Sequence, residues 1–368
     1  MATEPSEPRP ARVRVPASTS NLGSGFDCVG LAVSRYLDAA YEPDDAPLRI
    51  ERAGTLAALR AGVEDDVLAR AFRARLAAHG LSSARGTIRT TSDIPLSRGL
   101  GSSAAAVVAG LALADAVAGS EPAANDDPHH DRPHPHFPRS SPARAEGRKG
   151  EAARVEGRGG ADAPAPARLS EQRGRAALEY DWLLEATQLE GHPDNAAPAI
   201  FGGLVAVARD ADGAPRVVPL PLSPDVGFAY AAPGAKVSTA AARRALPEAV
   251  PHGVAARGLG RLAALLHGLA VADAELIRIG FTDELHVPYR LPLIPGAQDA
   301  MDAAHAAGAW AVTISGSGSG LIAACEPARA ADVAAAMADA FRRAAGPDDV
   351  VHFPAKPALL GVRVEIER

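Results

Sequence analysis

The sequence predicts a two-lobed protein that mixes strands with helices, of the α/β or α+β class. Three observations support this prediction. The chain has 368 residues, more than one compact core usually holds, so two domains are the default expectation. Apolar residues make up 47% of it and aromatic residues 4%, which predicts aliphatic cores and alanine-rich helices. Segments with strand and helix patterns alternate along the chain.

The N-terminal elements surround two segments rich in glycine and serine. A strand begins at Val13 and leads into the first segment, PASTSNLGSGFDCVGLAV. Residues 65–79 have helical apolar spacing, and the β-branched run 87–91 predicts a strand. The second segment, PLSRGLGSSAA at 95–105, opens a predicted helix over 102–118.

Two stretches lack the composition of a folded core. Residues 1–10 are polar and contain prolines, so we expect a flexible tail. Residues 120–168 contain eight prolines but no Leu, Ile, Met, Trp or Tyr. Such a segment cannot bury enough apolar surface to offset its ordering entropy, so we expect a disordered insertion. Its four histidines are interpreted as solvated low-complexity sequence rather than a metal site.

The alternation resumes after the insertion. A helix capped by Ser170 is predicted to end at Gly191, and a strand follows over 201–208. Near the end, AWAVTISGSGSGLIAAC predicts two strands joined by a glycine–serine loop. Further strands and helices are predicted over 227–231, 240–245, 258–271 and 300–307.

Bulk properties argue against several functional classes. The net charge of -6 does not suit a dedicated nucleic-acid binder. The two cysteines, Cys28 and Cys325, form neither a disulfide framework nor a zinc spacing, which fits a reducing compartment. No signal peptide is recognisable, and the longest strictly apolar or glycine stretch, 104–114, is far shorter than the roughly 18 residues of a membrane span. We therefore expect a soluble, cytoplasmic protein that binds neither nucleic acid nor membrane.

Three polar clusters are candidates for chemistry. At 95–105, backbone N–H groups converge on a helix N-terminus, which suits a polyphosphate, although a tight turn has the same pattern. The cluster is not a P-loop, because no lysine follows its second glycine. LEGHPDNAAPAIFGG at 189–203 also suits a structural loop. SGSGSG at 315–320 suits an anion nest or a hairpin turn.

In this order, the three clusters resemble the three motifs of the GHMP kinase superfamily, in which PxxxGLGSSAA binds the ATP phosphates. PASTSNLGSGFDCVGLAV, GHPDNAAPAIFGG and PGAKVSTAAAR resemble, more narrowly, the homoserine kinase family. The resemblance covers the chain from about Val13 to its end, except the insertion. It implies an α+β fold with an N-terminal ATP-binding lobe over 11–213, like the second domain of ribosomal protein S5. It implies a ferredoxin-like lobe over 214–368, with ATP between the two.

The same resemblance implies an activity, ATP-dependent phosphorylation of the hydroxyl of L-homoserine, whose product feeds threonine synthesis. Some homologues are dimers, so a homodimer stays open. Another GHMP kinase of small alcohols, or a catalytically silent ligand sensor, are the alternatives. The implied ATP-binding residues are Pro95, Leu96, Ser97, Arg98, Gly99, Leu100, Gly101, Ser102, Ser103, Ala104 and Ala105.

The resemblance also implies residues for the amino-acid substrate and for catalysis. Asp27 suits an ammonium group, and the forks of Arg243 and Arg290 suit a planar carboxylate. Because Asn195 is an amide and cannot take a proton, the implied mechanism is positioning and charge neutralisation. Asp194 is a candidate base on the sequence alone, but the resemblance implies a structural role for it. The implied substrate-binding residues are Asn21, Asp27, His192, Thr239, Arg243 and Arg290, and the implied catalytic residues are Asn195, His192 and Arg243.

Magnesium is expected from the family, which uses a helix glutamate together with a serine of the phosphate loop. The family glutamate lies eleven residues before the asparagine, a position occupied here by Leu184. Glu185 fits if the connecting loop is one residue shorter. We therefore expect Glu185 and Ser102 as the magnesium ligands, with Ser103 as the alternative serine and Glu190 as the alternative glutamate.

Overall fold

The computed structural model describes residues 8–81, 84–119, 166–346 and 349–365. Most of the expected tail, 1–10, and of the expected insertion, 120–168, lies outside the described residues. Residues 166–168 are described and belong to helix α3, Pro166–Glu190. This helix therefore begins before its predicted cap, Ser170.

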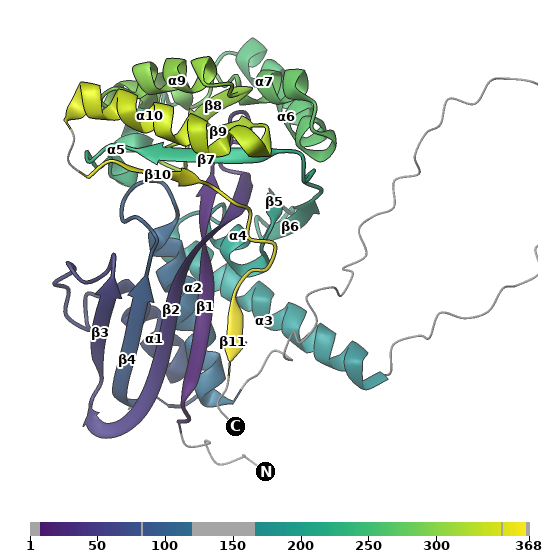
Figure 1. Cartoon of the computed structure of the whole chain (residues 1–368). Helices are drawn as coiled ribbons and strands as arrows, with labels where there is room; N and C mark the ends of the chain where they lie inside the picture. Colours follow the sequence, from purple (N-terminus) through teal and green to yellow (C-terminus); the bar gives the residue numbers. More distant parts are fainter. Residues whose placement is uncertain (1–7, 82–83, 120–165, 347–348, 366–368) are drawn as a thin grey trace, which may run out of the picture.

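Two sheets form the two lobes (Figure 1). The first sheet has the strand order β11-β1-β2-β4-β3, with β5 paired to β2 and β6 paired to β5. Its strands are β1 Ala11–Ser20, β2 Val29–Pro47, β3 Arg49–Gly54, β4 Arg85–Ser92, β5 Leu204–Arg209, β6 Pro215–Leu220 and β11 Arg363–Glu365. Its helices are α1 Val67–Ala78, α2 Ser102–Ala118, α3 and α4 Ala196–Phe201.

The second sheet is antiparallel and has the order β10-β7-β9-β8. Helices α9 and α10 pack against each other and against this sheet. The elements of this lobe are β7 Gly227–Ala232, α5 Thr239–Arg244, α6 His252–Val271, α7 Ala274–Phe281, α8 Val287–Arg290, α9 Ala297–Ala306, β8 Ala311–Ile314, β9 Leu321–Cys325, α10 Ala330–Ala345 and β10 Val351–Pro354, with short 3-10 turns at Leu291–Leu293 and Pro327–Arg329. The predicted mixture of strands and helices in two lobes is confirmed.

The chain crosses between the lobes twice. The expected boundary at 213/214 falls inside the hairpin in which β5 and β6 pair from Leu204–Leu220 to Arg209–Pro215. Strand β11 returns to the first sheet and pairs with β1. Because hydrogen-bonded strands belong to one sheet, we propose that the division lies after Leu220 and that β11 belongs to the N-terminal lobe.

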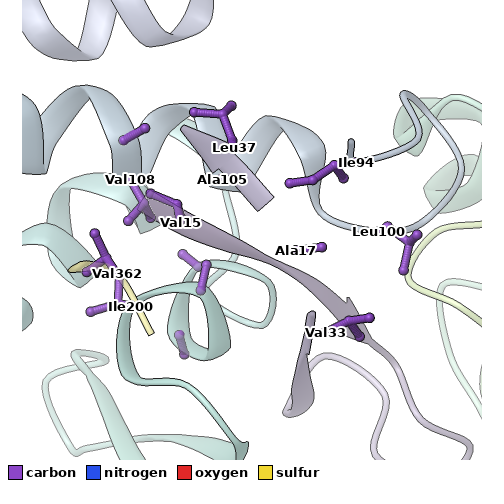
Figure 2. Packing of buried hydrophobic residues seen from close by; sticks show 14 of the residues in the cluster. Val15, Ala17, Val33, Leu37, Ile94, Leu100, Ala105, Val108, Ile200 and Val362 are labelled. Atoms are coloured by element: carbon purple, nitrogen blue, oxygen red, sulfur yellow. The ribbon is translucent and has the colours of Figure 1, made fainter. Parts of the chain in front are cut away.

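Helix α2 lies at the centre of the first lobe. Thirteen of its residues are buried, because the sheet covers one side while α1 and α3 pack on others. Figure 2 shows Ala105 and Val108 of this helix near Val15 of β1, with Ile200 and Val362 close by. The helix begins and ends where the sequence predicts, since Gly101 and Gly119 both adopt the left-handed conformation at its ends.

One strand begins later in the chain than the sequence predicts. Residues 201–208 were expected as one strand, but Phe201 ends α4 and β5 begins at Leu204. Gly202 and Gly203 between them have φ values of 75° and 62°. Glycine adopts this left-handed backbone at little cost, and here it turns the chain between the helix and the strand.

Within the described part of the chain, α6 is the one helix long and apolar enough to cross a membrane by length and composition alone. A helix of a soluble lobe passes the same test, so this is weak evidence for a span. Helix α6 packs against α7, and its Arg257 and Arg261 pair with Glu284 at 2.9 and 3.0 Å. We interpret it as a helix of the second lobe.

The α1–α2 contact depends on a missing side chain at Gly110. A Cβ there would lie 2.4 Å from the carbonyl oxygen of Leu68. We expect Gly110→Ala to lower the free energy of unfolding by about 1–3 kcal/mol, as overpacking typically does. The measurement is the urea midpoint of unfolding.

Gly260 of α6 is the matched control, since a Cβ there meets nothing within 4 Å. Gly260→Ala should stabilise the protein by roughly 0.5–1 kcal/mol, the usual gain from replacing glycine inside a helix. Equal effects of the two substitutions would contradict the close α1–α2 approach.

Candidate active site

Three loops meet where the two lobes join. The β1 end, the phosphate loop at 95–105 and the loop at 315–320 are held together by short hydrogen bonds. The hydroxyl of Ser315 donates to the carbonyl oxygen of Gly99 at 2.7 Å, and its oxygen lies 2.8 Å from that of Thr19. Because the single Ser315 proton is used on Gly99, the Thr19 hydroxyl is the donor in the second bond. The Gly316 N–H also donates to the Ser20 carbonyl at 2.9 Å.

These loops border a cavity of about 510 Å³. The structure brings most of the sequence-predicted site residues to it, from both lobes. Those that line it are Asn21, Ser97, Arg98, Gly99, Gly101, Ser102, Ser103, Ala104, His192, Asn195, Thr239, Arg243 and Arg290. Pro95, Leu96, Leu100, Ala105, Asp27 and Glu185 do not line it.

The phosphate loop is built tightly around its glycines. Gly99 and Gly101 have φ values of 76° and 61°. A Cβ on Gly101 would lie 2.2 Å from the Ser18 hydroxyl oxygen and 2.9 Å from the Asn195 Oδ1. Helix α2 then begins without an acidic residue in its first turn and without a side-chain cap. Its free N–H groups and its dipole therefore face the cavity as an anion-binding end.

Asn195 is held beside this helix start by two serines of β1. Its Oδ1 accepts from Ser18 at 3.0 Å, and its Nδ2 donates to Ser20 at 2.9 Å. Both polar ends of the amide are therefore oriented, and the residue sits at the N-terminus of α4. An amide fixed in this way can position a hydroxyl group but cannot accept its proton.

His192 and Asp194 form a pair next to Asn195. The His192 Nδ1 and the Asp194 Oδ1 are 2.5 Å apart. This hydrogen bond to a carboxylate raises the pKa of His192 above 6.5, against the effect of its burial. Burial raises the pKa of Asp194, but the hydrogen bond and the charge of His192 outweigh it, so that the pKa is lowered. Asp194 is 1% exposed, which suits a residue that orients His192.

At the edge of the cavity, Arg243 and Asp27 form a two-pronged ion pair. The two guanidinium nitrogens lie 3.3 and 3.2 Å from the two carboxylate oxygens. Both side chains are about 40% exposed, so the pair faces solvent at the cavity edge. Asn21 lies beside it: its Oδ1 accepts from the Asp27 N–H at 2.8 Å. Thr239, one turn before Arg243, contacts Ser317 at 3.3 Å.

Arg290 is 2% exposed and is held by backbone oxygens. Its Nε donates to Ala242 at 3.2 Å and its Nη1 to Gly316 at 3.5 Å. Its guanidinium lies 5.0 Å from the centre of the Phe26 ring. Burial lowers the pKa of Arg290. The residue therefore supplies a fixed positive charge to the cavity wall.

The sequence analysis missed His286, which supports the same wall from behind. His286 is fully buried, stacks on Phe26 at 5.1 Å between ring centres, and lies 3.2 Å from the Gly23 carbonyl. Burial lowers its pKa to about 4, so the ring is neutral near pH 7. Its place four residues before Arg290 was the one available signal.

The expected magnesium ligand Glu185 lies away from the cavity. Its carboxylate forms a hydrogen bond with Arg75, which also pairs with the buried Asp115 at 2.8 Å. Glu190 lines the cavity instead, and its Oε1 accepts from Ser103 at 2.6 Å. The physical reason is helical geometry: five residues along α3 turn the side chain by about 140°, so Glu185 and Glu190 lie on different faces.

A second cavity, of about 320 Å³, opens beside the first. Both are lined by Ser97, Ser102, Ser103 and Lys236. The rest of the second cavity is largely aliphatic, with Ile50, Leu56, Val67 and Leu96 among its residues. The start of α2 therefore lies between a polar cavity and an apolar one.

Two family models match the chain in order. The N-terminal domain model of the GHMP kinases matches residues 66–127, and the C-terminal model matches residues 258–343. The first match includes the phosphate loop, and the second spans most of α6 to α10. These matches define the class of protein as the GHMP kinases.

Comparison with individual relatives identifies the family within this class. A homoserine kinase of Synechococcus sp. (strain CC9605) is 34% identical over 336 residues, covering 90% of this chain and 89% of that protein. A homoserine kinase of Thermus thermophilus is 35% identical over 328 residues, covering 89% and 90%. The solved homoserine kinase of Cytophaga hutchinsonii has a TM-score of 0.69 over 99% of this chain and 100% of that chain, at 24% identity. The chain belongs to the homoserine kinase family of the GHMP kinases, which confirms the predicted family and fold.

The His192–Asp194 pair predicts a measurable titration. Because the folded pKa of His192 is raised, its pairing stabilises the protein fully below the ordinary pKa of about 6.5 and is lost as pH rises through the folded value. Asp194→Asn removes the charge and should move the His192 titration to lower pH. The titration midpoint is measured by NMR from the ring protons of His192, whose signals are identified by their loss in His192→Asn. An unmoved midpoint would rule out the pair.

Proposed function

We propose that the protein transfers the γ-phosphoryl group of ATP to the hydroxyl of L-homoserine, giving O-phospho-L-homoserine for threonine synthesis. Its family membership supports this activity. The arrangement of the cavity supports it as well, since the anion-binding start of α2 and the Arg243–Asp27 pair line or border the same space.

The exposed Arg243–Asp27 pair is the observation that carries the choice of substrate. Homoserine is a zwitterion with one carboxylate and one ammonium group. When a zwitterion binds, the ion pair between Arg243 and Asp27 can be replaced by two ion pairs with the ligand. Arg243 then faces the carboxylate and Asp27 faces the ammonium group. Arg290 adds a fixed positive charge, because the backbone already holds its guanidinium.

The reaction needs positioning more than a base. The homoserine oxygen forms a bond to the γ-phosphorus while the bond from that phosphorus to the β,γ-bridging oxygen breaks, and ADP leaves. In such a loose transition state the alcohol proton leaves late, to an oxygen of the transferred phosphoryl group and from there to solvent. Asn195, oriented by two serines, and His192 would hold the hydroxyl in line, and the N–H groups of α2 would neutralise phosphate charge.

Magnesium fits the residues at this cavity. Mg²⁺ prefers oxygen ligands and is usually bound by one or two carboxylates together with substrate phosphates. Glu190 and Ser103 supply a carboxylate and a hydroxyl that already lie 2.6 Å apart at the start of α2. The described residues contain no group of three His, Cys, Asp or Glu side chains suited to a metal, so the ion would depend on the ATP phosphates. When bound, it would neutralise charge on the phosphates.

Nucleotide placement follows from the two cavities. The aliphatic second cavity would take the adenosine, and the shared residues Ser97, Ser102 and Ser103 would face the phosphates. Homoserine would then lie in the first cavity near Asn195. In this arrangement the γ-phosphate would reach from the boundary between the two cavities toward the hydroxyl in the first.

The activity is tested by coupled measurement of ADP release. We expect release with Mg-ATP and L-homoserine, well above release with mevalonate, shikimate or no alcohol. Release with another alcohol and none with homoserine would favour a different GHMP kinase. No release with any alcohol, despite ATP binding, would favour a ligand sensor.

Arg243 provides the test of the substrate end. Arg243→Ala should lower kcat/KM for homoserine about 10- to 100-fold, the loss expected for a charge-assisted hydrogen bond, with little change in KM for ATP. Arg243→Lys should recover only part of this loss in kcat/KM, because lysine keeps the positive charge but lacks the planar, two-pronged guanidinium group. Arg244→Ala is the control, since this exposed neighbour does not line the cavity. An equal loss in ATP hydrolysis without homoserine would mean that Arg243 acts on phosphate.

Glu190 and Glu185 form a matched pair for the magnesium site. Glu190→Gln should raise the Mg²⁺ concentration for half-maximal activity by at least the roughly tenfold typical of a lost outer-sphere partner. Glu185→Gln should leave that requirement unchanged and slightly lower the urea midpoint, since its carboxylate pairs with Arg75. The reverse pattern would restore Glu185 as the ligand.

A further inference from the structure

Lys236 differs from the other cations that line the active-site cavity. The guanidinium groups of Arg98, Arg243 and Arg290 are each hydrogen-bonded within the protein. Across the described residues, no hydrogen bond or ion pair involves the ammonium group of Lys236, whose side chain is exposed. Its charge is therefore available to a ligand.

Lys236 also lies at the boundary between the two cavities. It lines both of them, as do Ser97, Ser102 and Ser103 of the phosphate loop. It comes from the loop between β7 and α5, in the second lobe, so it approaches the start of α2 from the opposite lobe. An anion placed at that helix start would have backbone N–H groups on one side and this ammonium group on the other.

The backbone before Lys236 is fixed to the site. Arg98 of the phosphate loop donates to the carbonyl oxygens of Pro233 at 3.0 Å and Gly234 at 3.4 Å. Ser319 donates to the carbonyl oxygen of Ala235 at 2.5 Å. Three successive peptide units are thus held by the two loops that border the cavity. The position of the Lys236 Cα therefore follows the phosphate loop itself.

The composition of the chain makes a lysine here unusual. Of the 38 basic residues only three are lysines, Lys149, Lys236 and Lys356. Arginine supplies the positive charge almost everywhere else. An ammonium group is a compact point charge with three donors, whereas a guanidinium group is a planar fork. A lysine at this boundary indicates a need for the compact group, as in sites that bind a polyphosphate at one point.

We propose that Lys236 binds the phosphate chain of the nucleotide and supplies, from the second lobe, the lysine that the phosphate loop lacks. The inference rests on the proposed use of ATP but not on the identity of the alcohol. Segment 95–105 has no lysine, so α2 offers only backbone and hydroxyl donors to a chain of negatively charged phosphates. Lys236 adds a full positive charge opposite them and joins the two lobes through the nucleotide.

The test is calorimetric titration of the Mg²⁺-containing protein with ADP and with adenosine, in the absence of homoserine. Lys236→Met removes the charge and keeps the length of the side chain. We expect it to weaken ADP binding about 10- to 100-fold, as for a lost charge-assisted hydrogen bond, and to leave adenosine binding unchanged. Lys236→Arg should recover part of the loss. The wild-type affinity for ADP should also fall more steeply with added salt than that of the variant.

Lys356→Met is the matched control, because it removes the same charge from an exposed residue that lines neither cavity. It should leave both affinities unchanged. An unchanged ADP affinity in Lys236→Met would overturn the inference, as would equal weakening of ADP and adenosine, which would indicate a structural role. Because homoserine is absent from these titrations, their conclusion about Lys236 stays valid even if the protein phosphorylates another alcohol. Conversely, homoserine kinase activity would survive a negative result for Lys236.

Discussion

The hydroxyl group of Ser315 holds together the parts on which the site depends. It bonds to Gly99 of the phosphate loop and to Thr19 of β1, and all three belong to different segments of the chain. Both hydroxyl groups are fully buried, so losing one partner would leave an unsatisfied polar atom in the interior. The start of α2, the serines that orient Asn195 and the wall that carries Arg290 are all placed by this junction.

Several of the charged side chains at the cavity are already paired within the protein, and they could exchange these partners for charged groups of a ligand. Arg243 and Asp27 neutralise one another at the edge, and His192 and Asp194 form a hydrogen bond beside Asn195. Pairs of this kind keep the empty site stable while leaving each charge close to where a ligand group would sit. The exposed pair costs little to separate, because solvent screens it. The buried pair is harder to disturb, which suits a part that must keep its geometry while substrates come and go.

Local signals in the sequence were sufficient for the glycine-capped helix α2, whereas most of the residues that line the cavity were predicted through the family resemblance. Glu185 stays an untested prediction, but it lies away from the cavity, because a residue count across a loop does not determine which helix face carries a side chain. Strand β11 and the long strand β2 were missed because their pairing joins residues far apart in sequence. Lys236 lies inside the segment PGAKVSTAAAR, and His286 lies four residues before Arg290, but only their contacts, or the lack of them, distinguish their roles.

The return of β11 to β1 has a consequence for how the protein is made. On the ribosome, β1 emerges first, and its outer edge stays open until residues 363–365 arrive. The second lobe is complete by β10, so it can fold before the first sheet is closed. The nascent chain must therefore carry an exposed strand edge from the synthesis of β1 to that of β11, a state that favours pairing with other chains. Closure of this edge of the sheet therefore waits for residues that are synthesised after the whole second lobe.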